Sequence, residues 1–376
     1  MYGAISEEIQ RWRFFCPPKE KGKSMDFEQF REKLADEIKE LLSSLFGRET
    51  TIEARTVEKT NTTYDALTIK PIDSDVAVSI NATHLFELYE KGEDFGVIAS
   101  DTAKFVDNAL YNSPDFDINS VRDYSKMKER LTFEVISAER NADLLKSVPH
   151  KEIEDLAVVY RLELANCEQG VGTVLVTNQM IESYGITADR LHEDALANAP
   201  EFKPLVIETM EEVLARQMGI DVVQELGLDA IPKESMTYVA SVEGYVNGAG
   251  VLAYQDFMEK AAERANGSFY ILPSSIHELL IIPDTGKQDF KDLENMVREV
   301  NATTVDPKEQ LSDNVYHYDA KDKIFELGEK FMARQNNKEV KKSLSEKIKE
   351  KKEEIAKTPK KDEPGKESKI KEGRAK

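Results

Sequence analysis

The pattern of apolar residues changes abruptly after Gly47, and this change constrains the fold more than any other feature. Before Gly47, apolar side chains recur at spacings of three and four and share one helix face: Phe27, Phe30, Leu34, Ile38, Leu41 and Leu45. Gly47 stands where a helix C-cap belongs. Residues 51–58 and 64–72 are then rich in Thr, Ile and Val, and residues 75–80 alternate in polarity. The sequence predicts a helix followed by three strands.

The rest of the chain mixes strand and helix patterns without regular alternation. We expect helical structure over residues 85–111, strands at 132–136, 155–164 and 173–176, and helices at 178–184, 188–198 and 204–218. Beyond these we expect strands at 237–242 and 251–254, a helix at 256–266, a hairpin within YILPSSIHELLIIP, a helix at 289–300 and a strand at 314–319. Strands that cluster in this way favour an α+β fold with mixed, mainly antiparallel sheets and packed helices.

Changes in composition divide the chain into four parts. Residues 25–231 form a larger N-terminal α+β unit, and residues 232–334 form a smaller C-terminal one, with the boundary near Pro232. Residues 335–376 form a charged tail, in which EKIKEKKEEIAK is predicted to be a solvated helix and the remainder to be disordered. Residues 1–24 are either a disordered arm or a wrongly assigned start, because a Lys-Gly-Lys run precedes Met25 as a translated ribosome-binding sequence would.

Charge and composition exclude several classes of protein. The chain is 40% hydrophobic and 32% charged, and no run approaches the roughly 20 apolar residues of a membrane-spanning helix. The net charge is −20, yet residues 338–376 carry fifteen Lys and Arg against nine Asp and Glu. The body is therefore too acidic to bind nucleic acid, whereas the tail is a candidate contact for an acidic partner. Two cysteines, Cys16 and Cys167, favour a reducing cytoplasm.

The segment between the two apolar runs of the predicted hairpin is the most site-like part of the sequence. Hydroxyl, imidazole and carboxylate groups lie close together there, and the candidate catalytic residues are Ser274, Ser275, His277, Glu278, Asp284 and His317. The structural alternative is a turn in which Ser275 and Glu278 form a capping box. Short Ser- and Pro-containing connections mostly form turns, so we expect a structural role.

Cofactor and metal motifs are missing from the sequence. The glycine pairs at 170–172 and 248–250 precede predicted strands, whereas a dinucleotide-binding fingerprint follows a strand and begins a helix. The five histidines show no His-x-x-x-His spacing. We therefore expect no cofactor and no metal.

Three functional hypotheses follow from these patterns. The first is a non-catalytic binding or accessory protein with an unknown protein partner, because no catalytic spacing is present. The second is a hydrolase-like enzyme that uses Ser274 or Ser275 with His277 and Glu278, completed by Asp284 and His317. The third is metal binding by His277, His317 and nearby acids. The sequence favours the first of these hypotheses.

Four ordered motifs resemble a known bacterial family. They are FEVISAERNADLLKSVPHKEIEDLAVVYRLEL, SYGITADRLHEDALANAP, FYILPSSIHELLIIP and MVREVNATTVDPKEQLSDNVYHYD. Together they are similar to the family catalogued as domain of unknown function 5688, over about residues 25–319. The resemblance implies a bacterial cytoplasmic setting and brings no activity, fold or catalytic residue with it.

Overall fold

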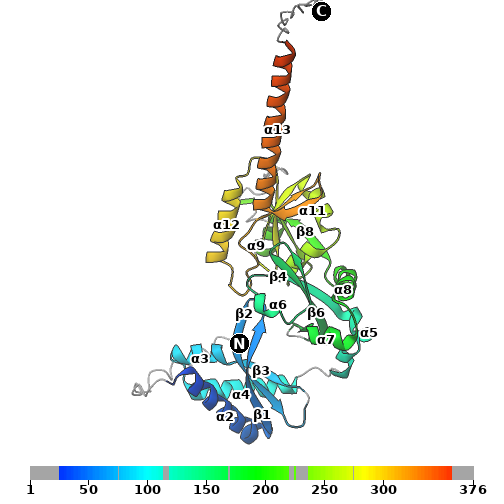
Figure 1. The fold of residues 1–376 in the computed structure, drawn as a ribbon. Helices are drawn as coiled ribbons and strands as arrows, with labels where there is room; N and C mark the ends of the chain where they lie inside the picture. Colours follow the sequence, from blue (N-terminus) through cyan, green and yellow to red (C-terminus); the bar gives the residue numbers. More distant parts are fainter. Residues whose placement is uncertain are drawn as a thin grey trace, which may run out of the picture.

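The chain forms an α+β protein built around three antiparallel sheets (Figure 1). The computed structural model describes residues 25–74, 76–112, 118–167, 170–219, 224–225, 236–273 and 275–357. A three-stranded sheet belongs to residues 25–112, which we call the N-terminal module. A four-stranded and a six-stranded sheet belong to the described residues from 118 to 327, which we call the body. The predicted fold class is confirmed.

Helix α2 (Phe27–Phe46) opens the N-terminal module, as its apolar period predicts. Asp26 and Gln29 form a capping box at its start, and Gly47 ends it in the left-handed conformation at φ 64°. The buried residues are Phe30, Leu34, Ile38 and Leu42. Leu45, which the sequence places on the same face, is instead 64% exposed.

The sheet of the N-terminal module has the order β1 (Thr50–Lys59), β2 (Thr62–Pro71), β3 (Val78–Asn81). A two-residue turn at Thr60 and Asn61 joins β1 to β2, with Asn61 in the left-handed region at φ 57°. Helices α3 (Ala82–Glu90) and α4 (Phe95–Tyr111) pack with α2 over Leu67, Ile69 and Ile80. The predicted helical region 85–111 is thus two helices, separated by a turn that contains Gly92.

The four-stranded sheet of the body is centred on β6 (Leu156–Cys167), which pairs with β4 (Leu131–Ser137), β5 (His150–Ile153) and β7 (Gly170–Leu175). Helix α8 (Ala188–Phe202) packs against β4 and β6. The shorter elements of this region are η1 (Ile118–Arg122), α5 (Tyr124–Met127), η2 (Lys128–Arg130), α6 (Ala142–Leu145) and α7 (Asn178–Tyr184). Strand β5 was not predicted, because its residues are exposed and show no polar–apolar alternation.

The six-stranded sheet has the order β13 (Ile324–Leu327), β12 (Tyr316–Asp319), β10 (Phe269–Leu272), β11 (Leu279–Pro283), β9 (Tyr238–Val242), β8 (Leu205–Thr209). Helices α9 (Met210–Met218), α11 (Phe257–Ala265) and α12 (Phe290–Thr303) flank it, together with η5 (Gly248–Ala253). One hydrophobic core joins both sheets of the body and contains Phe133, Tyr160, Ala240, Phe269 and Tyr316. A smaller core, with Tyr270 and Phe331, lies between this sheet, α12 and the helix that follows β13.

Two predicted elements are wrong. The predicted helix at 204–218 begins as strand β8, whose Leu-Val-Ile sequence pairs with β9, and only α9 is helical. The predicted strand at 251–254 belongs to the 3-10 helix η5. A Cβ at Gly248 would lie 1.9 Å from Ser241 Oγ, so only glycine at this position allows η5 to pack this closely against β9.

The boundary predicted near Pro232 lies outside the described residues. The strands before and after it, β8 and β9, pair in one sheet, and the core of the body includes residues from both sides. The core of the N-terminal module, by contrast, is a separate cluster that ends at Leu110. Packing therefore supports a division between residues 112 and 118, and the boundary at Pro232 stays a prediction.

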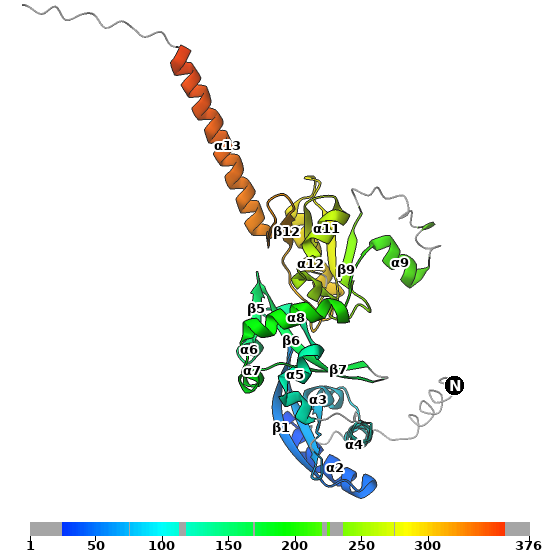
Figure 2. The ribbon, with the colours of Figure 1, turned by 90° about the vertical axis from the view of Figure 1, so that its right-hand side faces the viewer.

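Helix α13 (Gly328–Lys357) extends the chain beyond the sheets (Figures 1 and 2). Its first two turns attach to the body because Phe331 is buried and Arg334 pairs with Asp319 at 3.0 Å and Glu326 at 2.6 Å. The helix includes the segment EKIKEKKEEIAK, which was predicted to be helical. No helix in the described part of the chain is long and apolar enough to cross a bilayer. Residues 1–24 and 358–376 lie outside that part.

Candidate functional site

The predicted hairpin is present, and three of the candidate residues that the structure describes, Ser275, His277 and Glu278, lie in its loop. Strands β10 and β11 pair antiparallel, with Leu272 opposite Leu280. Ser274 lies outside the described residues. The Ser275 side chain is buried, and its Oγ accepts a hydrogen bond from the backbone N–H of His277 at 3.0 Å. In place of the predicted capping box with Glu278, Ser275 bonds to the backbone of the residue two positions later, and this bond orders the same turn.

The ring of His277 has partners on both nitrogens. Nδ1 accepts a hydrogen bond from the backbone N–H of Asn247 at 3.1 Å, so the neutral ring carries its proton on Nε2. Nε2 faces Glu309 Oε1 at 3.5 Å. The bond between Ser275 and His277 uses the backbone of the histidine and leaves its ring uninvolved. Burial raises the pKa of the Glu278 carboxyl, and His277 lowers it by a smaller amount.

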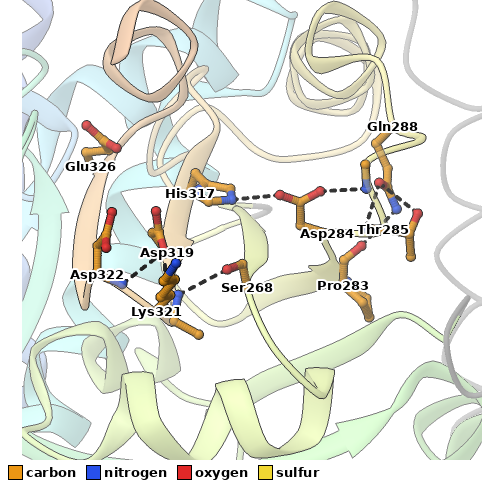
Figure 3. A network of polar contacts seen from close by, with 12 residues as sticks. Ser268, Pro283, Asp284, Thr285, Gln288, His317, Asp319, Lys321, Asp322 and Glu326 are labelled. Carbon is orange, nitrogen blue, oxygen red and sulfur yellow. Dashed lines mark hydrogen bonds and ion pairs between the residues drawn. The ribbon is translucent and has the colours of Figure 1, made fainter. Parts of the chain in front are cut away.

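His317 and Asp284 form a second polar pair, which Figure 3 shows. His317 Nε2 lies 3.0 Å from Asp284 Oδ2, and the hydrogen bond from His317 holds the pKa of Asp284 below its usual value. The histidine side chain is only 1% exposed and stacks on the ring of Phe331 with centroids 3.5 Å apart. Its Nδ1 is buried and has no hydrogen-bond partner in the described structure. No substrate atom could reach this ring without a rearrangement of the aromatic stack.

The five predicted residues that the structure describes therefore form two groups and not one site. His277 precedes β11 and Asp284 follows it, which separates the two pairs by about 20 Å along an extended strand. Within the described residues no group of three or more His, Cys, Asp or Glu side chains converges as a metal site would require. The described structure thus gives no support to a metal site that uses both His277 and His317.

An open groove in the N-terminal module has a volume of about 770 Å³. This volume is typical of small-molecule sites, which usually occupy about 300–1,000 Å³. The apolar part of the lining comes from α3, α4 and the sheet: Tyr64, Ile80, Leu85, Leu88, Val97, Ile98 and Phe105. Val97 is 51% exposed and Phe105 is 60% exposed, so the groove presents apolar surface to solvent.

Two lysines lie at one end of this groove. Lys59 comes from the end of β1, and Lys308 comes from the segment that follows α12 in the body. Neither has a carboxylate partner among the residues that the structure describes; the ammonium of Lys59 lies 5.7 Å from the centre of the Tyr64 ring. Sequence reasoning missed the groove because its leucines and valines have the spacing of ordinary core-facing helices.

The lysine end of the groove lies where the N-terminal module meets the body. Asn61 donates hydrogen bonds to the carbonyl oxygens of Lys308 at 3.0 Å and Gln310 at 2.7 Å. Thr60 donates to Glu134, which is 5% exposed and also pairs with Arg161 at 2.8 Å. The turn between β1 and β2 is thus fixed to the body by half-buried and exposed hydrogen bonds, which bring the two lysines into one groove.

A sequence model of one protein family matches residues 27–320 of this chain. The chain belongs to the family of unknown function DUF5688. The predicted resemblance is therefore confirmed. A search of the curated proteins and a search of the solved structures each found no match. The matched part of the chain includes the groove, the turn at Thr60 and Asn61, and both histidine pairs. Helix α13 lies beyond it.

Proposed function

We propose that this member of the DUF5688 family is a non-catalytic binding protein whose ligand occupies the groove of the N-terminal module. The single observation that supports the proposal is the groove itself: about 770 Å³ lined by exposed apolar side chains and two lysines without carboxylate partners in the described structure. The cytoplasm remains the proposed setting, on the strength of the two cysteines.

The placement of the hairpin residues favours binding over hydrolysis. A serine hydrolase needs an imidazole nitrogen free to accept the proton of the nucleophile. Nδ1 of His277 already accepts from Asn247, and His317 is enclosed by Phe331 and Tyr270. Ser275 and His277 thus have structural partners, which leaves the groove as the better candidate for function.

The proposal can be tested with the neutral apolar dye Nile red. We expect one dye molecule to bind per chain with a rise in fluorescence, and the Phe105→Asp variant to bind at least tenfold more weakly. Phe202→Asp is the matched control, because Phe202 is 48% exposed on α8 in the body. Equal dye affinity in the two variants, or no dye binding by the wild-type protein, would contradict the proposal.

A further inference from the structure

The charges around the groove indicate which chemical class of ligand it accepts. Lys59 and Lys308 lie 249 residues apart in the sequence and line the same end of the groove. The backbone of Lys308 is bonded to Asn61, which lies in the turn that follows Lys59. In a chain with 71 acidic and 51 basic residues, two neighbouring lysines that lack a carboxylate partner among the described residues form a local site for an anion.

The acidic residues of the lining do not neutralise the positive charge of the two lysines. Asp101 is paired with Lys104 at 3.1 Å, on the same helix. Helix α3 begins next to Asn81, which pairs with Ala66 on β2, four residues from Thr62 near the lysines. Glu93 lies in the turn at the opposite end of α3. Because α3 has nine residues, its length places Glu93 about 13 Å or more from the end of the helix that is nearer the lysines. The groove thus has a basic end and a distant acidic residue.

The walls between these ends are apolar. Leu85 and Leu88 of α3 are half-buried and face the groove, as do the more exposed Val97 and Phe105 of α4. A hydrocarbon chain placed along these residues would cover surface that the described structure leaves in contact with water, at a gain of about fourfold in affinity for each buried methylene.

We infer that the ligand is an acyl-chain carboxylate, with its carboxylate between Lys59 and Lys308 and its hydrocarbon chain along α3 and α4. This inference rests on the proposed function, because it names the ligand of the same groove. Since Lys308 belongs to the body and Lys59 to the N-terminal module, such a ligand also joins the two parts. Binding therefore stabilises the contact between them.

Displacement of Nile red by three ten-carbon amphiphiles, used below their micellar concentrations, tests the inference: decanoate, decan-1-ol and decyltrimethylammonium. We expect decanoate to bind at least fivefold more tightly than the alcohol and the cation to bind most weakly. Octanoate should bind about 15-fold more weakly than decanoate, because it lacks two methylenes. Added salt should weaken decanoate and leave the alcohol unchanged.

Matched variants identify the residues responsible. Lys59→Met/Lys308→Met keeps the aliphatic stems and should lower decanoate affinity about tenfold, with Nile red affinity within twofold of wild type. Lys291→Met/Lys321→Met removes two exposed lysines that also lack a carboxylate partner in the described structure, and should change neither affinity by more than twofold. If Nile red binds but decanoate shows no preference over the alcohol, or the two double variants behave alike, the ligand class is wrong and the proposed function stands. If Nile red itself does not bind, both fail.

Discussion

The loop of the β10–β11 hairpin and the groove of the N-terminal module differ in whether their polar side chains have partners within the protein. In the hairpin loop, Ser275 Oγ accepts a hydrogen bond from the backbone N–H of His277, and the ring of His277 accepts one from the backbone N–H of Asn247. On the neighbouring strand β12, His317 is enclosed by the rings of Tyr270 and Phe331. In the groove, Lys59 and Lys308 have no carboxylate partner in the described structure, and Phe105 remains exposed.

This difference separates residues that stabilise the fold from residues that remain available to a ligand. A polar group whose hydrogen bonds are all made within the protein contributes to stability and has little left to offer a substrate. Exposed apolar side chains and an unpaired charge lower the stability of the free protein, and they make favourable contacts only when a ligand binds. Substitutions in the hairpin should therefore lower stability and spare binding, whereas substitutions in the groove should do the reverse.

The largest expected loss of stability is at Gly248, beneath the hairpin. In Gly248→Ala the new Cβ would lie 1.9 Å from Ser241 Oγ and 2.3 Å from the carbonyl oxygen of His277. The backbone at Gly248 or at His277 must therefore move. We expect the free energy of unfolding in urea to fall by about 3 kcal/mol. Gly47→Ala is the control: its φ of 64° is strained but no atom lies within 4 Å, so a loss of about 1 kcal/mol is expected. Similar losses in both variants would contradict the close packing of η5.

The second prediction concerns the pair at the far end of β11. The pKa of Asp284 is lowered in the folded protein, so its contribution to stability is present above the unfolded pKa of about 4 and disappears as the pH falls through the folded value. Asp284→Asn should therefore lose about 1–2 kcal/mol at pH 7 and less at pH 3. Urea unfolding at both pH values measures this. A loss that does not depend on pH would show that the carboxylate charge makes no contribution.

The sequence could predict those features that depend on neighbouring residues. Helix α2 was predicted because Asp26, Gln29 and Gly47 cap a periodic apolar face, and the hairpin because two apolar runs flank a polar turn. Strand β8 was mistaken for helix because its five residues gain their structure from pairing with β9, which lies some 30 residues further along the chain.

The groove could not be predicted, for a physical reason. Leu85 and Leu88 are three residues apart on α3, which is the spacing of residues that face a core, and only the arrangement of α3, α4 and the sheet leaves them half-buried beside the groove. Lys308 joins the groove through contacts between Asn61 and the body, which no local pattern indicates. Proximity in sequence points to Ser275, His277 and Glu278 as one cluster, whereas Asp284 at the other end of β11 and His317 on β12 form a separate pair.

A third prediction tests the turn of the hairpin. Ser275→Ala removes the acceptor for the N–H of His277, and we expect unfolding in urea to become easier by about 1 kcal/mol. Decanoate affinity should remain within twofold of wild type, because neither Ser275 nor His277 lines the groove. If Ser275→Ala left stability unchanged and abolished binding or an esterase activity, the assignment of the hairpin as structural would be wrong.

The smallest expected effect on stability is in the groove. Phe105→Ser removes a ring that is 60% exposed, so we expect the free energy of unfolding to change by no more than about 0.5 kcal/mol while decanoate affinity falls at least fivefold. Thermal or urea unfolding measures the change in stability, and dye displacement on the same sample measures the decanoate affinity. A large loss of stability would mean that Phe105 belongs to the core and not to a ligand site.

Hydrogen–deuterium exchange with and without decanoate tests the contrast between the two regions most directly. We predict that decanoate slows amide exchange in the turn at Thr60 and Asn61, in α3 and α4, and in the segment around Lys308, and leaves residues 279–284 unchanged. Protection confined to residues 275–284 would contradict the account, because the ligand would then bind at the hairpin.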